Sequence, residues 1–191
     1  MPHRRLHRFA AICALALLAA ALLSACGKSS NKPGETVREG LSTPLGGLRY
    51  TVFLTRQLNL ANEEDKGYLP GTKEAPPGKG FYGVFLEACN KSTKDAVASS
   101  SFEITDTQGN TFEPTGLPQD NPFAFHGGVV PPQNCEPARG SLAQQGPTSG
   151  AMLLFELPLP ATENRPLELH IRGPFDPVKG KVSEATVILD I

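Results

Sequence analysis

Cysteine is the residue type with the most informative reactive side chain in this sequence of 191 residues, which contains four cysteines. Cys26 directly follows Leu-Ser-Ala at residues 23–25. Small residues before a cysteine suit cleavage by a signal peptidase, and the cysteine thiol left at the new N-terminus suits thioether lipidation. We therefore expect Cys26 to be a modification site, provided that an export signal precedes it.

The segment before Cys26 has the order of parts found in such a signal. It begins with three arginines within eight residues, contains no acid, and continues as an apolar stretch at residues 9–23. That stretch is shorter than the roughly 20 apolar residues that cross a bilayer as a helix. Together with Leu-Ser-Ala-Cys it resembles the lipobox signal of bacterial lipoproteins, the alternative being an ordinary signal peptide with an accidental cysteine. The resemblance implies that residues 1–25 are removed and that Cys26 carries a stable two-chain lipid anchor.

Export would place the chain on the extracytoplasmic side of the cell membrane, at the cell surface or in the periplasm. Gly27 follows the lipidated cysteine, which leaves the sorting between two membranes open. Removal of the signal leaves 15 basic and 19 acidic residues, so the net charge changes from −1 to −4. This charge offers no basic face, and we expect no nucleic-acid partner.

The rest of the chain divides by composition into a tether and one domain. Residues 26–47 are rich in serine, glycine, proline and charge, which predicts a flexible tether of roughly 25 Å. Residues 48–191 show period-two patterns without a convincing helical repeat, and long connections are expected at 61–80 and 114–150. Strands are predicted near residues 50–54, 81–88, 102–104, 111–113, 151–157, 167–171 and 185–191. The pattern indicates an all-β fold, an antiparallel sandwich of about seven strands, in which 81–88 is covered on both faces.

Three motifs in this domain follow one another in a familiar order. They are Glu-Ala-Cys-Asn-Lys-Ser at 87–92, a strand that turns through Asp-Thr-Gln-Gly within 101–114, and a Gly-led strand at 150–158. Their order resembles a family of bacterial lipoprotein domains of unknown function with a telokin-like, immunoglobulin-like fold. The resemblance covers roughly residues 48–191 and implies an immunoglobulin-like sandwich, but implies nothing about activity.

Cys89 and Cys135 are the two cysteines of the expected domain. An even pair in an exported domain is most simply a disulfide, which here would pin the second long connection to the sandwich. A pair of free thiols, or a redox or metal role, is the alternative, although no CxxC motif is present.

Other candidate chemistry is sparse. His126 and His170 are the only histidines beyond the signal, and they lack the clustered partners of a copper site, so we expect surface side chains. Residues 62–65, Asn-Glu-Glu-Asp, could supply calcium ligands but lack the regular spacing of a calcium loop, which favours a solvated loop. Known catalytic motifs are absent. We expect no catalytic residue, no metal and no cofactor.

Aromatic residues in the long connections are the most suggestive binding feature. Tyr68, Phe123 and Phe125, the last of them next to His126, lie outside the strand patterns. Exposed aromatics on loops often mark partner sites, which makes these four residues candidates for partner binding. The alternative, which we favour for the aromatic rings, is a small satellite core beneath the loops.

These patterns predict a lipid-anchored extracytoplasmic binding or interaction module that is not an enzyme. Its partners would be the membrane, through the lipid, and another envelope protein or a wall component. The alternatives are an envelope hydrolase with an unrecognised site in the long loops, or a metal-carrying envelope protein.

Overall fold

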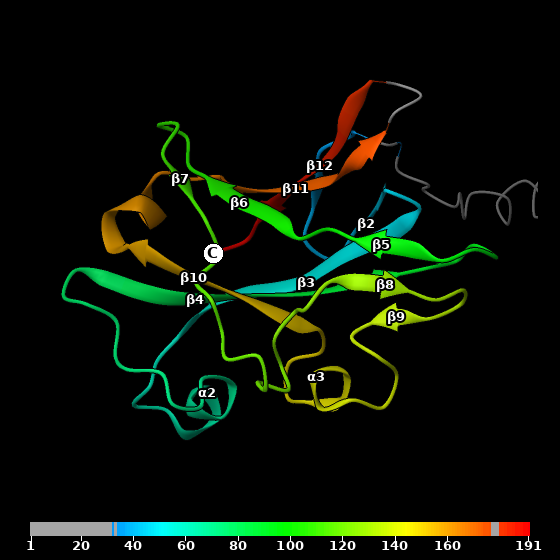
Figure 1. Ribbon diagram of the computed structural model, residues 1–191. Helices are drawn as coiled ribbons and strands as arrows, with labels where there is room; N and C mark the ends of the chain where they lie inside the picture. Colours follow the sequence, from blue (N-terminus) through cyan, green and yellow to red (C-terminus); the bar gives the residue numbers. More distant parts are fainter. Residues whose placement is uncertain (1–31, 33, 177–179) are drawn as a thin grey trace, which may run out of the picture. The chain divides into compact units, whose positions relative to one another are not determined.

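The structure is a computed structural model that describes residues 32, 34–176 and 180–191 (Figure 1). The predicted signal and the lipidation site Cys26 lie outside these residues and stay predictions. In the described part of the chain, no helix has the length and apolar character needed to span a membrane.

Two sheets pack against each other, as the strand patterns predicted (Figure 1). The first sheet has the order β1-β12-β11-β6-β7, formed by β1 (Val37–Arg38), β12 (Lys181–Leu189), β11 (Leu167–Asp176), β6 (Ser101–Thr105) and β7 (Thr111–Phe112). The second has the order β10-β4-β3-β2, with β9 added beside β4, formed by β10 (Ala151–Pro158), β4 (Lys79–Cys89), β3 (Leu48–Leu58), β2 (Ser42–Leu45) and β9 (Cys135–Glu136). A small ribbon pairs β5 (Ala96–Ala98) with β8 (Gly128–Val130). Because every strand pair except β1–β12 is antiparallel, the antiparallel sandwich is confirmed.

The seven predicted strands are all present, as β3, β4, β6, β7, β10, β11 and β12. The main core lies between the two sheets and is built from their inward-facing aliphatic and aromatic side chains. A second apolar cluster, which includes Tyr68 at the end of α2 (Glu63–Tyr68), lies on the outer face of the second sheet. α2 and the short helix α3 (Leu142–Gln145) both lie on this side of the sheet (Figure 1). Residues 80–86 of β4 are therefore buried on both faces, as their unbroken apolar run predicted.

A bulge at Phe53 changes the predicted face of one strand. Val52 pairs with Leu86, and the next registered residue of β3 is Leu54 opposite Phe85. The extra residue moves Leu54 to the outer face, where it is 38% exposed, and turns the buried Thr55 inward. Simple alternation over the predicted strand at 50–54 would place Val52 and Leu54 on one face, but the bulge reverses the alternation beyond it.

The predicted tether is shorter than composition suggested. Residues 37–45 form β1 and β2, which pair with β12 and β3, and Val37, Thr43 and Leu45 are buried. The interpretation of this stretch as a flexible linker is wrong, because backbone hydrogen bonds to β12 and β3 and two aliphatic side chains in the core stabilise it as strands. These strands are too short to show an alternating apolar pattern in the sequence. Only residues 27–36 remain between Cys26 and the first strand.

The acidic residues 62–65 begin α2 and are not a solvated loop. The Asn62 side chain caps the helix by accepting from the Glu64 backbone N–H at 2.9 Å. Asp65 is 3% exposed, its carboxylate lies 2.6 Å from the Arg56 guanidinium, and it also accepts from the Asn59 N–H at 2.7 Å. Asp65 therefore serves structure, as the buried partner of a charge-assisted hydrogen bond.

The predicted turn after β6 is confirmed, and Asp106 organises it. Its carboxylate accepts from the backbone N–H groups of Gln108 and Asn110, from the Asn110 side chain, and from the Asn164 side chain. These bonds, the one from the Asn110 side chain foremost, hold the pKa of Asp106 at about 2, below its usual range.

Stability should depend on this carboxylate at acid pH. Since the pKa is lower in the folded chain, the stabilisation is complete above about pH 4 and is lost as the pH falls towards 2. Thermal unfolding between pH 6 and pH 2 should show a steeper loss for the native chain than for Asp106→Ala. Parallel profiles for the two proteins would contradict the assignment.

Candidate binding pocket between the sheets

The second long connection runs along the outer edge of β10. Thr115 forms a bridge with Leu154, and its N–H donates to the Leu154 carbonyl at 2.6 Å. Further on, Met152 donates to the Phe123 carbonyl at 2.6 Å and accepts from the Phe125 N–H at 2.9 Å. The connection is thus held to β10 at two points, with a gap between them.

A pocket of about 230 Å³ opens at this gap, on the side where β6 of the first sheet faces β10 of the second. We call it the inter-sheet pocket. Phe102 and Leu153 of the main core form its apolar lining, and Phe125, His126 and Ser100 also line it. The Phe125 ring packs edge to face on Phe102, with ring centroids 5.4 Å apart. The inter-sheet pocket is therefore an open site that is lined in part by residues of the main core.

One wall of the inter-sheet pocket is fixed by buried hydrogen bonds. The Ser99 N–H donates to the Tyr50 hydroxyl oxygen at 2.7 Å, and burial raises the pKa of Tyr50. The Ser99 hydroxyl lies 2.6 Å from the Arg172 carbonyl and accepts from the Ser101 N–H at 3.0 Å. Because Ser99 is engaged in structural bonds, it is not an activated nucleophile.

A carboxyl group lies beside His126. Burial raises the pKa of Glu136, while a hydrogen bond from the His126 backbone and the charge of the His126 ring act in the opposite direction. His126 is exposed at the pocket and Glu136 is half-buried. The His126 ring, which lines the pocket, can exchange hydrogen bonds with a ligand.

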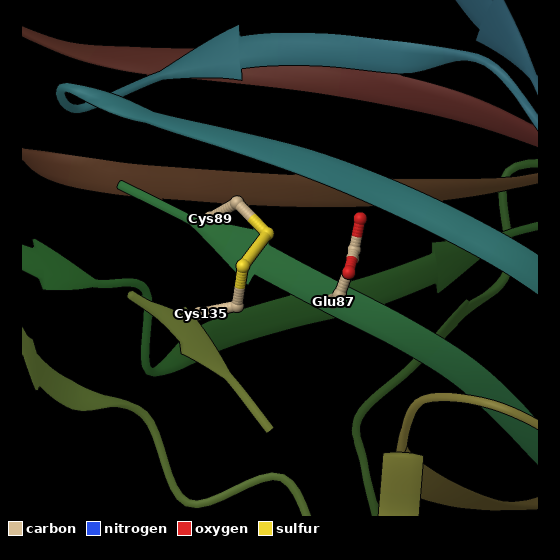
Figure 2. Close-up of side chains that lie close together, drawn as sticks. All are labelled: Glu87, Cys89 and Cys135. Carbon is tan, nitrogen blue, oxygen red and sulfur yellow. A yellow bond between two sulfur atoms is a disulfide. The ribbon is translucent and has the colours of Figure 1, made fainter. Parts of the chain in front are cut away.

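The predicted disulfide joins Cys89 to Cys135, with an S–S length of 2.04 Å (Figure 2). The two residues are registered partners on β4 and β9, and Glu87 lies beside them. Burial raises the pKa of the Glu87 carboxyl. Although these three side chains lie within metal-ligand distance, both sulfurs are committed to the disulfide and neither is a thiolate. The alternative of two free thiols is therefore wrong.

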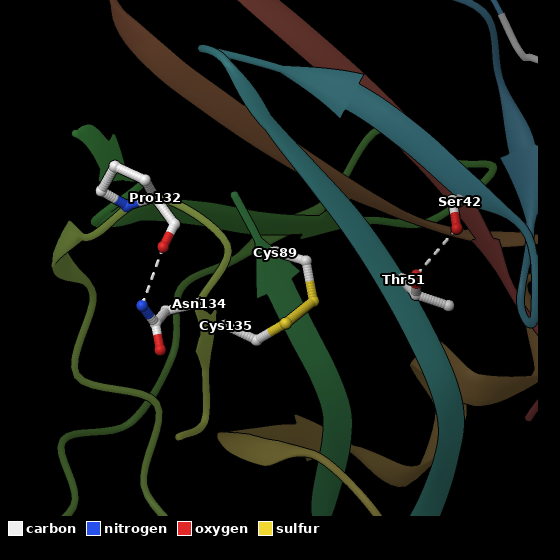
Figure 3. Close-up of a disulfide and its surroundings, with 6 residues drawn as sticks. All are labelled: Ser42, Thr51, Cys89, Pro132, Asn134 and Cys135. Atoms are coloured by element: carbon white, nitrogen blue, oxygen red, sulfur yellow. Dashed lines mark hydrogen bonds between the residues drawn. A yellow bond between two sulfur atoms is a disulfide. The ribbon is translucent and has the colours of Figure 1, made fainter. Parts of the chain in front are cut away.

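Figure 3 places the disulfide between two local hydrogen bonds, Ser42 to Thr51 at 3.0 Å and Asn134 to the Pro132 carbonyl at 2.9 Å. Cys135 immediately precedes Glu136, which contacts His126. The disulfide therefore anchors the part of the connection that carries one side of the inter-sheet pocket.

The four predicted partner-binding residues divide into two pairs. Tyr68 is 1% exposed, and its ring packs on Phe85 and Phe123 at centroid distances of 5.1 Å and 4.7 Å. Tyr68 is buried in the satellite cluster and does not offer its ring to a partner, whereas Phe123 packs against the same cluster and is partly buried. Phe125 and His126 do line the pocket. His170 lies apart on β11, where its ring nitrogen is 3.0 Å from the Glu184 carboxylate.

Sequence reasoning missed the other side of the pocket. Ser99, Ser100 and Leu153 come from segments far apart in the chain, and only the sandwich brings them to Phe125. Glu136, whose carboxyl contacts the His126 backbone, belongs to no motif that a sequence reading would single out. A period-two pattern places Leu153 in the core, but it does not indicate that the core opens beside it.

Asn90, in the turn after β4, links that turn to β8 through its side-chain hydrogen bonds. It is fully buried, its side-chain NH₂ donates to the Lys94 and Val130 carbonyls at 2.8 Å, and its oxygen accepts from the Ser92 N–H and hydroxyl. Asn90→Ala should lower the free energy of unfolding by about 2 kcal/mol, because it leaves buried polar groups unpaired. Urea unfolding measures the loss, with the exposed Lys91→Ala as control. Equal stability of both variants would contradict this role.

No protein-family model matches the sequence, and no curated protein is detectably similar to it. Among solved structures, the yjhA protein from Bacillus subtilis is similar over 81% of this chain and 99% of its own, at 12% identity and a TM-score of 0.52. An uncharacterized β-sandwich protein from Clostridium difficile is similar over 86% of this chain and 99% of its own, at 16% identity and a TM-score of 0.44. The ycdA protein of Bacillus subtilis, provisionally described as a lipoprotein, is similar over 77% of this chain and 38% of its own, at 9% identity and a TM-score of 0.46. The first likeness supports the β-sandwich fold and nothing finer.

Proposed function

We propose that the chain is a lipid-anchored binding module on the extracytoplasmic side of the cell membrane. It holds another envelope protein or a wall component at the inter-sheet pocket and catalyses no reaction. The lipobox-like signal supports the anchoring and the location, and the pocket supports the binding.

One observation carries the binding proposal: the pocket is lined in part by main-core residues and lies between walls that are already fixed. Phe102 and Leu153 line it while staying largely buried, at 6% and 7% exposed, and the bonds of Ser99 and the disulfide hold the surroundings in place. A pre-formed apolar site loses little conformational entropy on binding.

The size of the pocket favours part of a large partner over a free small molecule. Its volume of about 230 Å³ lies below the roughly 300–1,000 Å³ typical of small-molecule sites. Such a space suits one projecting side chain or sugar substituent, with the rest of the partner lying on the surrounding surface. Ser100 and His126, which line the pocket, supply polar groups that would orient it.

A photoreactive amino acid placed at Ser100, an exposed pocket residue, tests this in the native host. We expect a discrete covalent adduct with an envelope component after irradiation. The matched control is the same amino acid at the exposed Glu163, in the helical turn after β10. Gly116→Trp, which adds an indole at the pocket lining, should abolish the adduct.

Two outcomes would contradict the proposal. One is the absence of an adduct at Ser100, or equal labelling at Ser100 and Glu163. The other is an adduct that Gly116→Trp leaves intact, which would place the contact elsewhere. A hydrolytic activity of the purified chain that His126→Ala abolishes would favour the enzyme alternative.

A further inference from the structure

A second pocket, of about 450 Å³, opens where β3 and β4 part. The last registered pair of these two strands is Leu58 and Phe81, and beyond it the lining continues with residues 59–60 and 79–80. Residues 74 and 75, from the connection between α2 and β4, line the pocket as well. We call this space the strand-end pocket. Its described lining residues are all different from those of the inter-sheet pocket, so the two are separate sites.

Hydrogen bonds fix the backbone on both sides of the strand-end pocket. The Asn59 N–H donates to the buried Asp65 carboxylate at 2.7 Å, and the Asn59 carbonyl accepts from the Asn62 N–H at 2.8 Å. On the other side, the Lys79 N–H donates to the Pro76 carbonyl at 3.0 Å. The backbone of the site is therefore in place before a ligand binds, which reduces the conformational entropy lost on binding.

Two amide side chains in the lining have hydrogen-bonding groups to spare. The Asn59 side-chain oxygen accepts from the Ala61 N–H at 2.9 Å, which leaves the NH₂ group to donate. The Gln57 side chain lies against the backbone of β4, since a Cβ added at Gly80 would be 2.9 Å from the Gln57 Nε2. Glycine at position 80 thus leaves room for the Gln57 amide. Within the described part of the chain, this amide group has no hydrogen-bond partner.

The lining contains one acid and one base, Glu74 and Lys79. The Lys79 ammonium lies 2.7 Å from the Glu156 carboxylate, so its charge is already paired. The Glu74 carboxylate is exposed and, among the described residues, forms no ion pair or hydrogen bond. An anionic ligand would therefore find a paired cation and an unpaired carboxylate, which disfavours it.

The spare groups of the lining include both donors and acceptors. The NH₂ groups of Gln57 and Asn59 donate, whereas the Gln57 oxygen and the Glu74 carboxylate accept. An ammonium group on a ligand could only donate, and a carboxylate or phosphate group could only accept. A hydroxyl group does both. A neutral ligand rich in hydroxyl groups can therefore pair with all of these side chains.

The size and the apolar part of the lining agree with such a ligand. The volume of about 450 Å³ lies within the roughly 300–1,000 Å³ typical of small-molecule sites, unlike that of the inter-sheet pocket. Leu58, Leu60, Ala75 and Phe81 supply aliphatic and aromatic carbon to the lining. A sugar ring presents C–H groups as well as hydroxyl groups, so it matches a lining of both kinds.

We propose that the strand-end pocket binds a neutral saccharide. Gln57, Asn59 and Glu74 exchange hydrogen bonds with its hydroxyl groups, and the apolar side chains contact the ring carbons. This inference goes beyond the proposed function and does not rest on it, since it uses neither the lipid anchor nor the inter-sheet pocket.

Ligand-observed NMR tests this with the full chain in phosphocholine micelles, whose headgroups contain no sugar. The probes are cellobiose and N-acetylglucosamine, which are neutral, and glucuronate and protonated glucosamine, which are charged. We expect saturation transfer to the neutral probes and weaker transfer to the charged ones. Gln57→Ala should weaken binding of the neutral probes about tenfold, through lost hydrogen bonds to the ligand. Gln119→Ala, which removes an exposed amide outside both pockets, is the matched control and should leave binding unchanged.

Glu74→Gln is a second variant, in an exposed loop, that should also weaken binding of the neutral probes. No transfer to either neutral probe at about 10 mM, which fills most of a millimolar site, would overturn the inference. Equal or tighter binding of a charged probe would show that charge governs the site and would overturn it too. So would saccharide binding that Gln57→Ala and Glu74→Gln leave unchanged, or that Gly116→Trp in the inter-sheet pocket abolishes.

Discussion

Replacing Cys89 and Cys135 together with alanine should lower the free energy of unfolding by about 2–4 kcal/mol. The disulfide closes a loop whose ends are 46 residues apart, so its loss returns much conformational entropy to the unfolded chain. Chemical denaturation of the oxidised protein and of the variant measures the difference. A reductant should destabilise the native chain and leave the variant unchanged. A variant as stable as the oxidised protein would contradict this role.

The same variant should loosen the inter-sheet pocket before the sandwich itself opens. Cys135 adjoins Glu136, whose carboxyl contacts the His126 backbone. The main core is built from other strands and does not depend on β9. We expect hydrogen exchange to accelerate at residues 126–136 while the amides of β11 and β12 keep their protection. Equal acceleration throughout would show a single cooperative unit.

Tyr68→Ala should lower the free energy of unfolding by about 3–5 kcal/mol, the range for removal of a buried aromatic side chain. The ring packs on Phe85 and Phe123, and the Arg56 guanidinium lies 5.7 Å from its centroid. The hydroxyl oxygen accepts from the Thr148 N–H at 2.9 Å and so joins α2 to the second long connection. Urea unfolding followed by circular dichroism measures the loss.

Tyr68→Phe is the control that separates packing from hydrogen bonding. It keeps the ring and removes only the acceptor for Thr148, so its cost should be about 1–2 kcal/mol. If Tyr68→Ala unfolds at the same urea concentration as the native chain, Tyr68 is not part of a cooperative core. Its assignment to the satellite cluster would then be wrong.

The long strands could be predicted because their side chains alternate or form unbroken apolar runs. β1 and β2 could not, since a segment with only Val37 and Leu45 in the core shows no period. The bulge at Phe53 depends on the partner strand. The Phe53 ring lies against Gly150. Position 150 requires glycine, because its φ is +112° and an added Cβ would lie 2.8 Å from the Leu86 backbone nitrogen. Such features are set by tertiary contacts, and a single sequence contains no local pattern for them.

The candidate site was predictable only in part, for the same reason. The composition of the second long connection drew attention to Phe125 and His126, and the even cysteine count to the disulfide. Tyr68 and Phe123 have the same residue type and setting in the sequence as Phe125, yet they pack into the satellite cluster. Only the packing of the two connections on β4 and β10 separates aromatic rings that line the pocket from those that support the loops.

The attachment of the second long connection to β10 also bears on aggregation. A strand at a sheet edge offers its N–H and C=O groups to any other chain, and β10 would offer a long apolar one. The Met152 N–H donates to the Phe123 carbonyl, and the carbonyls of Met152 and Leu154 accept from the N–H groups of Phe125 and Thr115. These bonds leave fewer groups on this edge free to pair with another chain, and the disulfide joins the same connection to β4. A reduced sample held at high concentration should form β-rich oligomers through β10, whereas the oxidised protein should not.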